Sequence, residues 1–175
     1  MDFFSGSCIE GYESTCSSMS IEDFTYHWGF LIGPKDESAE LVPGLRCHVK
    51  NHPLQGWAYE EVGLRNVKAT NTLLARIVIA KIEDKKRLLR LLRETRVVQN
   101  DPNFRCRTWV SDALLRISNS KPSVVGTSEL DWDKIERKAR RYVEKKTAAG
   151  RYLEADRMLD PKPTWNLMEE KEVTD

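Results

Sequence analysis

The sequence lacks the long apolar run that a membrane-spanning helix requires, since no stretch approaches roughly 18 uninterrupted apolar residues. The first residues also lack the basic start and the apolar core of a secretory signal. A surplus of one charge is missing as well, because 28 Lys and Arg stand against 27 Asp and Glu. We therefore expect a soluble, cytoplasmic protein without a membrane span, in which any electrostatic binding site is local.

Cysteine and histidine are scarce, with four and three residues respectively. The cysteines at positions 8, 16, 47 and 106 form no CxxC pair, so the sequence offers neither a structural zinc motif nor a redox motif. We expect free thiols, as in a reducing compartment, and neither a metal nor a cofactor.

The composition suits one globular domain, because 175 residues with 40% hydrophobic content can bury one sizeable core. Residues 1–20 are rich in Ser, Gly and acidic residues without a period, which predicts a flexible N-terminal arm. We expect a single catalytic-type domain over residues 21–160 and a C-terminal tail over residues 161–175.

Hydrophobic periodicity predicts an α+β fold. Apolar residues alternate or cluster as in strands over residues 24–32, 44–51, 56–63 and 73–82, which predicts a small antiparallel sheet of about four strands. A helical period follows Asp84 and returns at Cys106. A last helix is expected from about residue 129 to 149, with Ser128 as its N-cap. We expect helices to pack against one face of the sheet.

The segment "FRCRTWVSDALLRI", residues 104–117, places Cys106 near the start of an amphipathic helix. Unpaired N–H groups and the helix dipole stabilise a thiolate there, and the flanking Arg105 and Arg107 would act in the same sense. Cys106 is therefore a candidate nucleophile. The alternative is a buried structural thiol, which is a common state of free cysteine.

His27 is the candidate base for this thiol. It lies in an aromatic strand, on the face that also carries Gly29, where a missing side chain would let a helix approach. If the Cys106 helix packs on that face, imidazole and thiol can meet. The alternative is a core histidine bonded to backbone.

A third polar group usually orients such a base. His48 in the next strand is the natural candidate, because neighbouring strands lie about 4.8 Å apart. His52, Asn51 and Asn103 are further candidates, and an exposed position for His48 is the alternative.

Three pieces of sequence resemble the circularly permuted papain-like thiol enzymes, in particular the lecithin:retinol acyltransferase-like and NlpC-type branches. They are "HWGFLIG" at residues 27–33, "CHVK" around His48 and "CRTW" at residues 106–109. The opening "HWGFLIGPK" is also similar to that of small fungal proteins. The resemblance implies a permuted papain-like fold with Cys106 as nucleophile, His27 as general base and His48 as orienting residue.

The same resemblance implies acyl transfer or hydrolysis of an amide or ester through an acyl-enzyme. The Cys106 backbone N–H, at the helix start, is the expected oxyanion donor. Substrate contacts are expected from Trp28, Trp57, Trp109 and Glu60. The acyl donor, the acceptor and the oligomeric state stay open.

A basic helix inside a neutral protein suggests a second class of function. Residues 134–151 carry eight basic residues against two acidic ones. The candidates for binding a polyanion are Arg137, Lys138, Arg140, Arg141 and Lys145. An alternative function is therefore amide or cyclodipeptide formation from aminoacyl-tRNA at the same thiol, with tRNA on the basic helix. Solvated charge is the plain interpretation, and a non-catalytic binding module with a papain-like shell is the third alternative.

Overall fold

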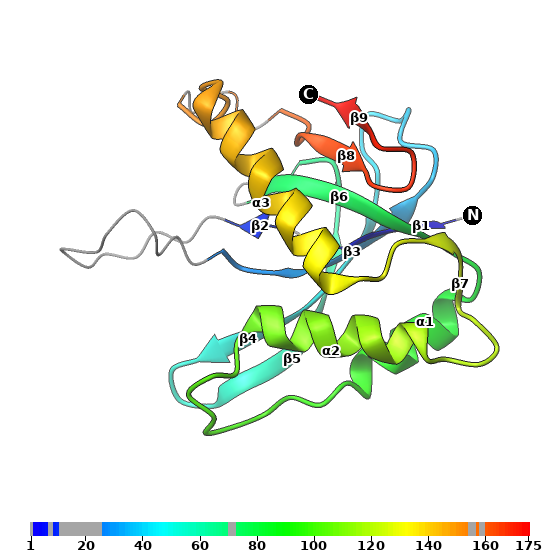
Figure 1. Ribbon diagram of the computed structural model, residues 1–175, viewed down its shortest axis with the longest axis vertical. Coiled ribbons are helices and arrows are strands. Elements are labelled where there is room, and N and C mark those ends of the chain that lie inside the picture. The colour runs from blue at the N-terminus through cyan, green and yellow to red at the C-terminus, as the bar shows by residue number, and fades with distance from the viewer. Residues whose placement is uncertain (1, 7–8, 11–25, 70–72, 154–156, 158–159) are drawn as a thin grey trace.

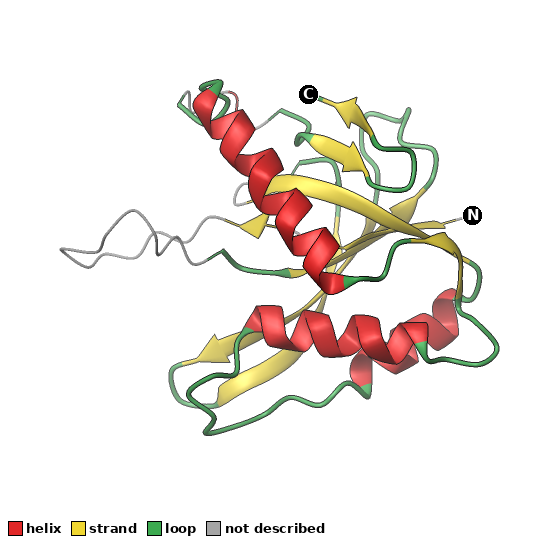
Figure 2. Cartoon of the chain, viewed as in Figure 1, coloured by secondary structure: helices red, strands yellow, loops and turns green. Residues whose placement is uncertain are grey.

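The computed structural model describes residues 2–6, 9–10, 26–69, 73–153, 157 and 160–175. Its strands are β1 (Asp2–Gly6), β2 (Ile9–Glu10), β3 (Gly29–Pro34), β4 (Gly44–His52), β5 (Gly56–Leu64), β6 (Leu73–Ile82), β7 (Val125–Ser128), β8 (Thr164–Asn166) and β9 (Lys171–Thr174). Its helices are α1 (Lys85–Arg93), α2 (Cys106–Ser118) and α3 (Trp132–Ala148). Figure 2 shows these helices and strands as an α+β arrangement, which confirms the predicted class.

One twisted sheet organises the chain, with strand order β5-β4-β3-β1-β6-β8-β9, while β2 and β7 also pair with β6. Neighbouring strands are antiparallel except β6 and β8, which run parallel. The four expected strands correspond to β3, β4, β5 and β6. Short strands from both ends of the chain enlarge the sheet beyond them.

Both ends of the chain differ from the expectation. Residues 2–6 form β1, which pairs with β3 on one side and β6 on the other, so this part is not a loose arm. Residues 11–20 of the predicted arm lie outside the described residues. The predicted tail supplies β8 and β9, which pair with β6 and with each other. Backbone pairing with an available sheet edge outweighs the polar composition of these segments.

Local chemistry defines the helix starts. Asp84 caps α1 by accepting a hydrogen bond from the Arg87 N–H at 2.9 Å. Asp131 caps α3 in the same way, accepting from the Lys134 N–H at 3.0 Å. The expected cap, Ser128, instead ends β7 and pairs with Ala80 of β6.

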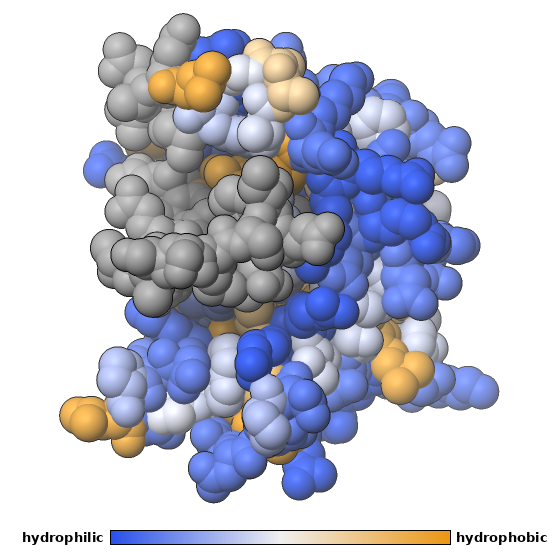
Figure 3. Space-filling model, turned by 60° about the vertical axis from the view of Figure 1, so that its left-hand side comes forward, coloured by the Kyte–Doolittle hydropathy of each residue, from blue (hydrophilic) through white to orange (hydrophobic). Residues whose placement is uncertain are grey.

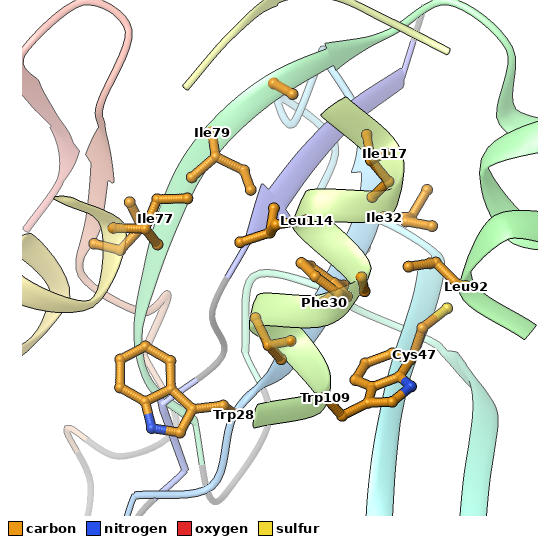
Figure 4. Packing of buried hydrophobic residues seen from close by; sticks show 14 of the residues in the cluster. Trp28, Phe30, Ile32, Cys47, Ile77, Ile79, Leu92, Trp109, Leu114 and Ile117 are labelled. Atoms are coloured by element: carbon orange, nitrogen blue, oxygen red, sulfur yellow. The ribbon is translucent and has the colours of Figure 1, made fainter. Parts of the chain in front are cut away.

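The helices bury their apolar sides against one face of the sheet. Phe30 and Ile32 of β3 lie in one core with Trp109, Leu114 and Ile117 of α2, as Figure 4 shows. In the view of Figure 1, α2 and α3 both lie in front of the sheet. Among the described residues, no helix has the length and apolar content needed to cross a membrane.

The hydrophobic residues that do reach solvent are scattered. Figure 3 shows them on one face as separate patches among hydrophilic residues. Leu54, at the turn between β4 and β5, is 98% exposed. The two strands joined by this turn carry His48 and Glu60.

Candidate thiol–histidine site

Cys106 is the first residue of α2 and lies against the chain just before β3. Arg105 is extended at the N-cap, and its N–H donates to the Thr108 hydroxyl at 3.4 Å, which fixes the start of the helix. The Cys106 sulfur accepts from the Trp28 N–H at 3.4 Å and lies 3.8 Å from the Tyr26 carbonyl oxygen. The sulfur therefore contacts the backbone on both sides of His27.

The surroundings of Cys106 raise the pKa of its thiol. Burial raises its pKa, and the N–H groups of Trp28, Arg107 and Cys106 lower the pKa without cancelling that effect. The charge of Arg107 acts in the same direction as the N–H groups, whereas the Arg105 guanidinium donates to the Phe104 carbonyl at 2.8 Å. Burial outweighs the helix start and the nearby arginine in the pKa of this thiol, because Cys106 is only 8% exposed.

His27 and His48 form a pair on the opposite face of the sheet from α2. The Nε2 atom of His27 lies 2.7 Å from Nδ1 of His48, and the two rings meet edge to face. His48 pairs with Gly29 across β3 and β4, and a Cβ on Gly29 would stand 2.8 Å from the His48 Cβ. The helix does not pack on the Gly29 face as expected, and the missing side chain instead makes room for His48.

Glu60 continues this pair into the next strand. It is opposite His48 in the β4–β5 register, with its Oε2 atom 3.2 Å from His48 Nε2. Its Oε1 atom lies 2.8 Å from His52 Nε2. Burial opposes ionisation, but the His52 hydrogen bond and the nearby His48, His52 and Lys50 charges outweigh it, so the pKa of Glu60 is lowered.

Glu60 was expected to contact substrate, and its hydrogen bond to His52 and its ion-pair distance to His48 went unpredicted. The contact between His48 and Glu60 could have been predicted from the β4–β5 hairpin. A turn centred on Leu54 pairs His52 with Gly56, and the same register pairs His48 with Glu60. Of the residues expected to orient His27, His48 is the one that contacts it. His52 contacts Glu60 instead, and the Asn103 N–H donates to the Asp101 side chain.

The tryptophans expected to bind substrate lie mainly in the core. Trp28 is 1% exposed and meets the Trp132 ring edge to face, while Trp109 is fully buried against Phe30. These two have no surface for a substrate and serve the packing of α2 and α3. Trp57 is half-buried, with its ring edge-on to Phe104.

A second buried thiol provides an internal comparison. Cys47 is fully buried in β4, and burial together with the Glu61 carboxylate raises its pKa to about 12. Glu61 is engaged by the Tyr59 hydroxyl and by Arg93, the latter through two bonds of 2.7 Å. Cys47 is therefore a structural thiol.

The basic helix divides into two sets of residues. Arg137, Arg141 and Lys145 are exposed on α3, so they remain candidates for a polyanion. Lys138 and Arg140 are half-buried: the Lys138 ammonium lies 3.4 Å from the Trp165 ring centroid, and Arg140 binds Glu136. Among the residues that the structure describes, no cluster of His, Cys, Asp and Glu is arranged to hold a metal ion.

Comparison with known proteins assigns the chain to a family. The sequence profile of a family of unknown function, DUF6914, matches residues 11–174. The chain belongs to this family. Neither the curated proteins nor the solved structures contain a match to it.

Proposed function

We propose that the protein catalyses thiol-dependent acyl transfer, or hydrolysis of an amide or ester, with Cys106 as nucleophile and His27 as base. One observation carries the proposal: the sulfur lies against the backbone of Tyr26 and Trp28, on either side of a histidine that is bonded to a second histidine. A helix start, an imidazole and an orienting group are the components of an activated cysteine.

The proposed reaction begins with a neutral thiol, since burial raises the pKa of Cys106. His27 stands at the strand end where the sulfur meets the backbone of Tyr26 and Trp28, and its Nε2 is engaged with His48. The proposal therefore requires Nδ1 of His27 to reach the sulfur from the other face of the sheet and take the thiol proton as sulfur attacks the carbonyl carbon. Backbone N–H groups near the sulfur, from Trp28 and from the first turn of α2, would stabilise the oxyanion. The leaving amine or alcohol takes the proton from His27, and water or an amine then cleaves the thioester.

We also propose that the protein is related to the permuted papain-like enzymes, and the arrangement of its histidines and cysteine supports this. A histidine just before one strand contacts a histidine in the adjacent antiparallel strand, and a cysteine begins a helix that packs on the same sheet. We propose a reducing compartment, the cytoplasm, because Cys47 and Cys106 are free thiols.

The burial of Cys106 favours a second candidate, a binding module in which the thiol is structural. Aminoacyl-tRNA as acyl donor remains a further proposal, and it depends on the exposed stripe of Arg137, Arg141 and Lys145.

Alkylation separates the enzyme from the binding module. The folded protein is treated briefly with iodoacetamide at several pH values, and the modified cysteines are mapped by mass spectrometry. Cys106 should react near pH 8 while Cys47 stays intact, because the pKa of Cys47 is about 12. His27→Ala should slow the reaction at Cys106 about tenfold by removing the base.

The pH dependence follows from the sign of the shift. Because the pKa of Cys106 is raised, its unassisted alkylation should keep accelerating beyond about pH 8.5, the ordinary thiol midpoint. A Cys106 that reacts only after unfolding, or equally with and without His27, would refute the proposed activity.

A further inference from the structure

Four side chains from three adjacent parts of the sheet are linked in one series. His27 contacts His48 at 2.7 Å, His48 lies 3.2 Å from Glu60, and Glu60 contacts His52 at 2.8 Å. The proposed reaction uses only the first two of these residues. Glu60 and His52 are left with a defined geometry and no assigned role.

The charge of Glu60 determines which nitrogens carry protons. Its lowered pKa keeps the carboxylate ionised, so it acts only as an acceptor and favours a proton on the facing Nε2 of His48. A neutral His48 then has Nδ1 as an acceptor, and His27 must present an Nε2–H to it. The lone pair of a neutral His27 is consequently on Nδ1, the atom that the proposed mechanism requires.

We propose that Glu60 is a positioning residue of the Cys106–His27 site, which sets the tautomer of both histidines through His48, and that His52 holds Glu60 in place. This inference rests on the proposed function. Glu60 is 33% exposed in its side chain, whereas the side chain of His48 is 4% exposed. The carboxylate thus bridges the protein surface and the buried histidine.

Other charges face the same group. Lys50 and Arg46 are the neighbours of His48 on its face of β4, and the charge of Lys50 also lowers the pKa of Glu60. From β5 the facing carboxylate is Glu60 itself, and from the chain before β3 the facing group is His27. Among these described neighbours on β4, β5 and the chain before β3, Glu60 is the one anionic group, so its removal leaves His27 and His48 beside Arg46 and Lys50.

The test compares Glu60→Gln with Glu61→Gln. Glu61 is adjacent in sequence but points to the other face, where it binds Arg93. Each full-length variant is alkylated with iodoacetamide, and its histidine side chains are followed by ¹⁵N–¹H spectra across pH. Glu60→Gln should slow Cys106 alkylation about tenfold, because loss of the orienting charge leaves the tautomer unfixed.

The spectra should also show the His27–His48 pair losing its proton roughly one pH unit lower in Glu60→Gln, because an anion that favours the charged form is gone. His52→Gln should move both readouts in the same direction by a smaller amount. Glu61→Gln should change neither.

The outcomes separate the two levels of the proposal. If wild-type Cys106 reacts in a His27-dependent way but Glu60→Gln behaves like Glu61→Gln in both readouts, Glu60 has no positioning role and the inference is overturned. If Cys106 of the folded wild type is inert although the spectra depend on Glu60, the proposed function fails. Glu60 then merely organises a histidine cluster, which also overturns its assignment to catalysis.

Discussion

At the scale of single residues, the two buried thiols differ through their neighbours rather than their burial. Cys47 faces the Glu61 carboxylate, which adds to the effect of burial on its pKa. Cys106 instead receives backbone N–H groups from Trp28 and from its own helix start, which oppose burial. The surroundings of Cys47 therefore oppose ionisation of its thiol, whereas the N–H groups around Cys106 favour a thiolate.

Gly29 determines whether His48 can reach His27, and its substitution tests this. A Cβ at position 29 would lie 2.8 Å from the His48 Cβ and 3.1 Å from the Cys47 carbonyl oxygen. We expect Gly29→Ala to lower the free energy of unfolding by about 1–3 kcal/mol, measured in urea, as overpacking does in other cores. Gly63→Ala is the matched control, because no atom lies within 4 Å of its Cβ position. Equal stability of the two variants would contradict this tight packing.

At the scale of elements, periodicity was sufficient for the central strands and for the helix that carries Cys106. It failed for β1, β8 and β9, because short polar strands are determined by the sheet edges that they meet and not by their own pattern. In the site, His27 and His48 were predictable from adjacent strands. The sequence could not predict which face of β3 is covered by α2, since both faces of this strand carry apolar residues.

The C-terminal hairpin is attached to α3 by charge. Lys146 is buried on α3 and contacts Glu172 at 2.5 Å and also the Asp175 side chain, while the Tyr142 hydroxyl donates to Glu172. Burial disfavours the Lys146 charge, but these hydrogen bonds outweigh it and leave its pKa raised.

Lys146→Met should lower the free energy of unfolding by about 1–2 kcal/mol, because it removes charge-assisted hydrogen bonds and keeps the aliphatic packing. The exposed neighbour provides the control, since Lys145→Met should have little effect.

The pH dependence of this difference has a defined sign. Burial opposes ionisation of Glu172, yet its bonds to Lys146 and Tyr142 leave its pKa lowered, and the bond to Lys146 lowers that of Asp175. The stabilisation is therefore complete above the unfolded values of about 4 and is lost as the pH falls through the lowered folded values. Denaturant melts at pH 7 and pH 3 should show the two lysine variants converging at the lower pH. A difference between the two variants that is as large at pH 3 as at pH 7 would exclude ion pairing as its cause.

At the scale of the whole molecule, strands from the two ends of the chain flank β6 in the sheet. β1 lies between β3, which follows His27 directly, and β6, which also pairs with β8. The first residues of the sequence thus complete the central part of the sheet. The position of β3 relative to β6 depends on backbone hydrogen bonds from this short strand.

A proline in β1 tests that dependence. Phe4 pairs with Ile32 on one side and with Ala80 on the other. Phe4→Pro removes a backbone donor in an interior strand, and a cost of at least about 2 kcal/mol corresponds to a fall in Tm of about 4–8 °C. In the wild type, hydrogen exchange should show β1 amides as protected as those of β3, while those of the exposed turn at residues 53–55 exchange fast. An unchanged Tm, with β1 amides exchanging as fast as the turn, would mean that β3 and β6 keep their spacing without β1, and that the core formed by β3, β6 and α2 positions Cys106 by itself.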